Sequence, residues 1–244
     1  MIDPSRPDAR PRREFIGQLA AAAAALAATA CVSGAGGSVV AAAESVPASD
    51  LPKLPPMPPL PKLEFDDAWT RKLTGMYRAV FDSPEIDDGT AVFNAFSFMK
   101  GFEDMYKVAD AEVNAVIVIR HRAIPMVLDD ELWARYKLGE YAKIKDPTTN
   151  QWAVRNPFWA PDPKDKSSAD YAIETLVKRG VVLLGCALAT RGFAGILASR
   201  TKDKPDAMFD ELRRHLLPTA TLQPSGIFAV MRAQVAGCHY MRST

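Results

Sequence analysis

The chain has 244 residues, of which 48% are hydrophobic and 24% charged, and its formal net charge is +1 at neutral pH. This length and composition allow one globular domain with a substantial core. The nearly balanced charge leaves no basic stripe of the kind that binds nucleic acid, so we expect no nucleic-acid partner.

Residues 1–43 have the composition of an export signal. Arg12 and Arg13 stand before an alanine-rich apolar stretch, residues 19–30, and small residues follow it. This order is typical of signal peptides, and the paired arginines resemble the bacterial twin-arginine signal. The apolar stretch is too short and too weakly apolar for the roughly 20 residues of a membrane span. We therefore expect a periplasmic or otherwise exported protein without a stable transmembrane span.

The processing of this segment has alternatives. Residues 41–43 form a small-residue cleavage site, whereas residues 28–31 loosely resemble a lipoprotein box and make a lipid anchor at Cys31 the alternative outcome. An ordinary alanine-rich helix is the other reading of the apolar stretch. Residues 44–63 follow as a tether, because proline lacks the amide proton and fixes φ, which gives an extended chain without a core. The domain itself spans residues 64–244.

The domain alternates short β-rich runs with helical patterns. Residues 113–119 are apolar without interruption, which is typical of a strand covered on both faces. Proline, glycine and polar turns separate the elements. We predict strands over 76–81, 113–119, 181–185, 219–222 and 238–241, helices over 90–106, 129–141, 169–178, 193–199 with 208–216, and 227–235, and a polar loop over 145–168. The predicted fold is α/β, a five-stranded and mainly parallel sheet with helices on both faces, doubly wound.

In such sheets ligands bind beyond the carboxyl ends of the strands, near the N-termini of the following helices. The loops there supply the candidate ligand-binding residues Asp82, Ser83 and Ser225, with Glu85, and the candidate catalytic residues Arg120, His121 and Cys186. Each has a structural alternative. Both serines stand where helix N-caps belong, Asp82 can fix its own turn, and Arg120 can pair with a carboxylate.

Cys186 is the candidate nucleophile, because a thiol at a strand-to-helix junction is stabilised as thiolate by the helix amides, and Arg191 could add positive charge. The alternative is a buried cysteine that acts as a small hydrophobe. Cys238 begins the last strand at the opposite edge of the sheet, so we expect two free thiols in the mature domain. The three histidines lack metal-ligand spacing and there is no nucleotide-binding glycine motif, so no metal or cofactor is expected.

Residues 179–192, with the sequence RGVVLLGCALATRG, form a short apolar strand that runs into a cysteine and then an alanine-rich helix start. This segment, the order of the five strands and the turn over residues 224–226 resemble the DsrE/DsrF-like sulfur-relay family. The resemblance covers most of residues 75–243. It implies that Cys186 accepts sulfur as a persulfide and that the protein forms a homo-oligomer.

Two classes of function remain open from the sequence. The first is a thiol-dependent sulfur carrier or redox protein in which Cys186 is the nucleophile, Arg120 and His121 stabilise charge, and a small sulfur compound or an anionic ligand is the partner. The second is a non-catalytic exported α/β protein that binds a small ligand or assembles as a structural oligomer. Thiol chemistry predicts an accessible Cys186, and simple binding predicts a buried, inert one.

Overall fold

The computed structural model describes residues 64–160 and 166–244. The described residues belong to one compact unit, which contains the sheet. The predicted export signal and its predicted cleavage sites, Cys31 and the predicted tether lie outside the described residues.

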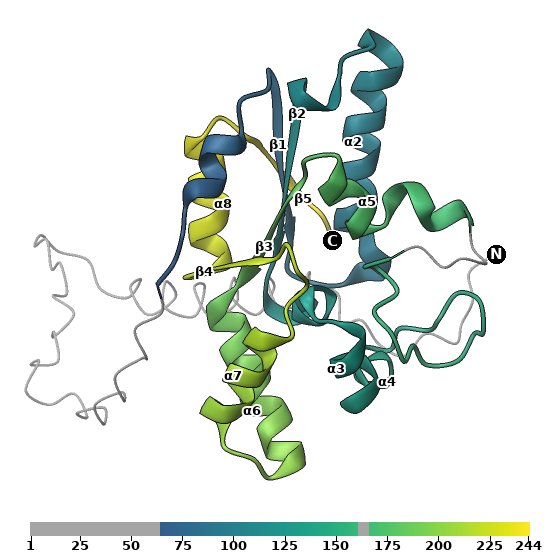
Figure 1. Ribbon diagram of the computed structural model, residues 1–244, viewed down its shortest axis with the longest axis vertical. Coiled ribbons are helices and arrows are strands. Elements are labelled where there is room, and N and C mark those ends of the chain that lie inside the picture. The colour runs from purple at the N-terminus through teal and green to yellow at the C-terminus, as the bar shows by residue number, and fades with distance from the viewer. Residues whose placement is uncertain (1–63, 161–165) are drawn as a thin grey trace, which may run out of the picture. The chain divides into compact units, whose positions relative to one another are not determined.

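The domain is built on one sheet of five parallel strands, in the order β4-β3-β2-β1-β5 (Figure 1). This confirms the α/β class, and the observed strand boundaries lie within about two residues of those predicted. The central strand is buried at every residue, as its unbroken apolar run requires. The strands are β1 Tyr77–Ser83, β2 Val113–Ile119, β3 Val182–Cys186, β4 Thr221–Gln223 and β5 His239–Arg242.

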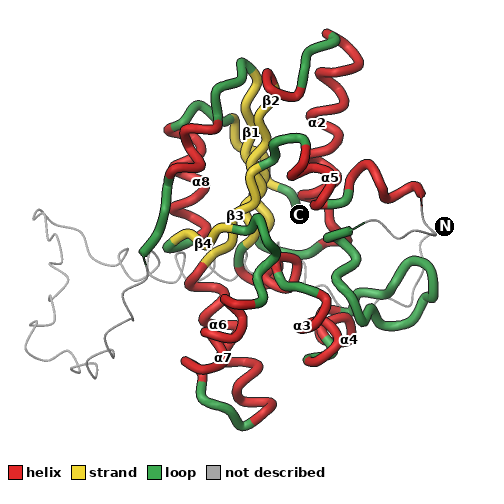
Figure 2. Tube along the Cα trace, viewed as in Figure 1, coloured by secondary structure: helices red, strands yellow, loops and turns green. Residues whose placement is uncertain are grey.

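Helices cover both faces of the sheet, which makes the fold doubly wound. On one face α2 (Thr90–Tyr106) and α5 (Ile173–Lys178) lie together, and on the other lies α8 (Gly226–Val235) with the 3-10 helix Ala68–Lys72 (Figures 1 and 2). Successive side chains along each strand point to opposite faces of the sheet, so the core consists of two clusters. Phe81 and Ile117 belong to the cluster under α2, and Val80 and Val116 belong to the cluster under α8. No helix of the described residues is long and apolar enough to cross a membrane.

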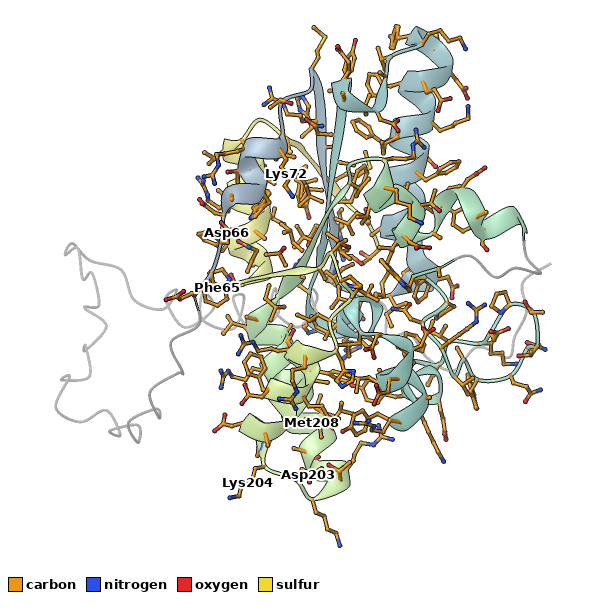
Figure 3. All side chains as sticks on the ribbon, viewed as in Figure 1. Phe65, Asp66, Lys72, Asp203, Lys204 and Met208 are labelled. Carbon is orange, nitrogen blue, oxygen red and sulfur yellow. The ribbon has the colours of Figure 1, made fainter. Side chains whose placement is uncertain are left out.

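Beyond the carboxyl ends of β3 and β4, α6 (Ala187–Thr201) and α7 (Pro205–Arg214) pack against each other as a helical hairpin. Asp203 and Lys204 mark its turn, away from the sheet (Figure 3). The sequence pattern placed the start of the first helix at residue 193, six residues too late. The helix begins directly after Cys186, because alanine-rich sequence supports a helix without an apolar periodicity.

The long connection between β2 and β3 corrects two further predictions. The helix expected over residues 129–141 is two short helices, α3 (Asp130–Arg135) and α4 (Leu138–Ala142), separated where Lys137 has a φ of 51°. The break lets Gly139 lie against the backbone of Ala153, so closely that a side chain there would meet its carbonyl oxygen. The helix expected over residues 169–178 is likewise divided, into a 3-10 helix Lys166–Tyr171 and α5.

Candidate functional site

The carboxyl ends of β1 and β2 bring a buried ion pair to the α8 face of the sheet. Arg120 Nε donates to Asp82 Oδ1 at 2.7 Å and its Nη2 to Oδ2 at 2.9 Å, and the Asp82 side chain is only 4% exposed. Tyr240 Oη donates to Asp82 Oδ2 at 3.0 Å from the neighbouring strand β5. The hydrogen bonds to Asp82 raise the pKa of Arg120, and desolvation, followed by the Asp82 hydrogen bond, raises the pKa of Tyr240.

The start of α8 is fitted to Arg120. Ser225 caps the helix, because its hydroxyl accepts a hydrogen bond from the Phe228 amide at 3.0 Å. A Cβ atom at Gly226 would lie 2.6 Å from Cβ and Cδ of Arg120, so only glycine permits this approach. Ser225 therefore has the capping role, and the capped helix terminus still faces the ion pair.

Cys186 ends β3 and is the N-cap of α6. Its Sγ accepts a hydrogen bond from the Ala189 amide at 3.3 Å, and its carbonyl oxygen accepts one from Thr190 Oγ1 at 2.9 Å. The Arg120 guanidinium lies near Cys186. The sulfur thus lies at the N-terminus of α6, where it accepts a hydrogen bond from a helix amide. The residue is only 5% exposed.

Three other predicted residues lie apart from this cluster. Ser83 occupies the opposite face of β1, where its hydroxyl donates to Glu85 O at 2.9 Å. His121 is exposed, with its Nδ1 3.4 Å from Glu85 Oε1, and it has a φ of 54°. Arg191 lies over the Phe209 ring and pairs with Asp206 of α7, so its charge is directed to the helical hairpin rather than to Cys186.

Two residues of the site were missed from the sequence. Tyr240 reaches Asp82 only because β5 pairs with β1. Gln223 is the register partner of Cys186 on β4 and is fully buried; its Nε2 donates to Asp66 O, while its Oε1 has no partner among the described residues. The sequence signal that could have pointed to Gln223 is its position as a polar residue directly before the turn at residues 224–226.

Cys238 lies at the other edge of the sheet. Both described cysteines are free, as predicted. By register, Cys238 precedes β5 at the level of Arg78, whereas Cys186 lies beyond the level of Ser83 and three strands away. The two thiols are thus separated by roughly 20 Å, far beyond disulfide reach. Burial raises the pKa of the Cys238 thiol to about 11.

No group of three or more metal-ligating side chains occurs among the described residues. His215, for example, is held by Asp129, with Nδ1 and Oδ2 2.8 Å apart.

Comparison with known proteins gives no family. No family model matches the chain, and no curated protein matches it. Among solved structures, the chain is similar to a protein of unknown function, MTH1491, from Methanobacterium thermoautotrophicum, with 16% identity and a TM-score of 0.36. The match covers 68% of this chain and 98% of that one.

Proposed function

We propose that the protein is a thiol-dependent sulfur carrier in which Cys186 is the acceptor, as the resemblance of residues 179–192 to the DsrE/DsrF-like family implies. The observation that carries the proposal is the hydrogen bond from the Ala189 amide to Cys186 Sγ at the start of a 15-residue helix. Arg120 adds a cation on the same side. Because Asp82 already compensates much of that charge, the helix amides are the main stabilising groups.

The chemistry needs no redox partner. The Cys186 thiolate attacks the outer sulfur of a small persulfide, the sulfur–sulfur bond of the donor breaks, and the donor leaves as its thiolate. Cys186 then carries the transferred sulfur as a persulfide, whose negative charge the Ala189 amide and Arg120 stabilise. Tyr240 and Asp82 hold the guanidinium in place.

The test is to incubate the folded protein with glutathione persulfide and to locate the added sulfur by peptide mass analysis. We expect one added sulfur on Cys186 and none on Cys238, because the neutral Cys238 thiol is a poor nucleophile. Cys186→Ser should abolish the adduct and keep the melting temperature within a few degrees, whereas Cys238→Ser should leave the adduct unchanged. An adduct on Cys238 alone, or none at all, would refute the carrier.

A second candidate is a non-catalytic binding or structural protein, and the burial of Cys186 favours it. With 5% of its surface exposed, Cys186 does not have the open access that thiol chemistry predicts. This second candidate function includes assembly of the protein into a homo-oligomer. The outer face of α8 exposes apolar side chains at helical spacing, Ile227, Met231 and Val235, which a homo-oligomer would cover.

Export by the twin-arginine route is part of the same proposal and rests on the sequence of residues 1–43. Replacing Arg12 and Arg13 together with lysine should retain the full-length chain in the cytoplasm, because the receptor distinguishes the guanidinium pair from ammonium groups. Cell fractionation measures this. Unchanged export of the variant would rule out the route, and lipid on Cys31 would establish the anchored alternative.

A further inference from the structure

A pocket of about 270 Å³ lies at the beginning of α2, apart from the thiol. The first turn of α2 forms one side, the loop with Pro157 and Phe158 forms another, and the chain around Tyr171 at the start of α5 forms the third. The volume is at the small end of ligand pockets, which fits a headgroup or a very small molecule.

Aromatic rings form the walls. Phe93 and Tyr171 have ring centroids 5.9 Å apart and planes at 79°, so the two rings make adjoining walls at nearly a right angle. Phe96 supports Tyr171 from behind, with centroids 6.1 Å apart. Phe158 supplies a third ring, and it packs so closely on Gly89 that a Cβ there would lie 2.8 Å from the ring. Gly89 also has a φ of 83°, which glycine adopts without strain.

The wall that carries Phe158 is fixed before any ligand arrives. Asn156 is 1% exposed, and its Nδ2 donates to the carbonyl oxygens of Met126 and Leu128 at 2.9 and 2.8 Å. Its Oδ1 accepts from the Phe158 amide at 3.0 Å. The Phe158 carbonyl in turn accepts from the Ile173 amide at 2.9 Å. A binding site held in this way loses little conformational entropy on binding.

An acidic side chain lines the pocket. Among the described lining residues, Asp88 is the one that carries a formal charge, and its carboxylate has no hydrogen bond or ion pair with another described side chain. Two amides at the start of α2 are bonded to the backbone, because Gly89 N donates to Ile86 O and Thr90 N to Asp87 O. The pocket thus offers aromatic side chains and a carboxylate.

We propose that this pocket binds a small alkylated ammonium cation, such as a trimethylammonium headgroup. Ring faces attract a cation through their quadrupoles, and methyl groups on the nitrogen fill the apolar space that an unmodified ammonium would leave. Asp88 supplies the counter-charge at the rim. This cation site is independent of the function proposed for Cys186.

The test is a calorimetric titration of the folded protein with choline chloride, compared at equal ionic strength with 3,3-dimethyl-1-butanol, in which carbon replaces the charged nitrogen. We expect choline to bind at least tenfold more tightly than the neutral analogue. Equal affinity of the two compounds would overturn the cation site in favour of an apolar one. Absence of choline binding up to tens of millimolar would overturn the site altogether.

Variants assign the binding to this pocket. Tyr171→Leu should weaken choline binding about tenfold, and Asp88→Asn several-fold; asparagine tolerates the φ of 50° at this position. Tyr106→Leu is the matched control, because Tyr106 is an exposed tyrosine near the far end of α2 that stacks on Tyr77 instead. Cys186→Ser should bind choline as the wild type does. Equal losses in the Tyr171 and Tyr106 variants would contradict the assignment.

Discussion

Replacing Arg120 with alanine is expected to lower the free energy of unfolding by about 3 kcal/mol, because the variant leaves the buried Asp82 carboxylate without its cation. The Arg120 side chain makes two hydrogen bonds to that carboxylate and packs on Gly226, so packing is lost as well. Urea unfolding followed by far-UV circular dichroism measures the change. The free energy of unfolding of Arg120→Lys should lie between the values for the wild type and for Arg120→Ala, since an ammonium cannot reproduce the two hydrogen bonds of the guanidinium.

The matched control is Arg122→Ala. Arg122 is two residues further along and exposed, and its guanidinium has no hydrogen bond or ion pair with another described residue. Its loss should change the free energy of unfolding by no more than about 0.5 kcal/mol. The double variant Asp82→Asn with Arg120→Ala should recover part of the stability, because a neutral amide costs less to bury than an unpaired charge. Equal effects of the two single arginine variants would contradict the central role of the ion pair.

Replacing Asn156 with alanine is expected to destabilise the domain by about 2 to 4 kcal/mol. The variant leaves the buried carbonyl groups of Met126 and Leu128 without the hydrogen bonds that Asn156 donates to them. The same change frees the loop that carries Phe158. Choline affinity should therefore fall as well, in protein that is still folded at low temperature. Urea unfolding and the calorimetric titration provide the two measurements.

Gln151→Ala is the control for that experiment. Gln151 lies in the same connection and is exposed, so its truncation should leave both stability and choline binding nearly unchanged. A stable Asn156→Ala variant would mean that the loop is held by its backbone bonds to α5 and by the hydrogen bond from the Asn156 amide to Asp130.

The sequence predicted the sheet because strand patterns are local. The unbroken apolar run of β2 and the turns at Pro84 and Pro224 are readable without neighbours. The break at Lys137 could not be read from the local pattern, because it accompanies a contact of Gly139 with Ala153, which lies in a different part of the connection. Propensity is overridden there by tertiary packing.

The sequence predicted only part of the candidate site, again because local patterns do not record tertiary packing. The rule that strand ends converge placed Asp82, Arg120 and Cys186 together, but it does not tell on which face of the sheet each side chain lies. One residue along a strand changes the face, and this separates Ser83 from Asp82. Tyr240 enters the site through the pairing of β5 with β1, a long-range choice that no local pattern records.

The most direct test of the central claim is the rate at which iodoacetamide alkylates the two thiols of the folded protein at pH 7, resolved by peptide mass mapping. Both cysteines are buried, each 5% exposed, so neither residue has an advantage in overall exposure. Cys238, with its pKa raised to about 11, is almost fully protonated at that pH. Cys186 accepts a hydrogen bond from the Ala189 amide at the start of α6, and it should react at least tenfold faster than Cys238. Equal rates, or faster alkylation of Cys238, would contradict the account.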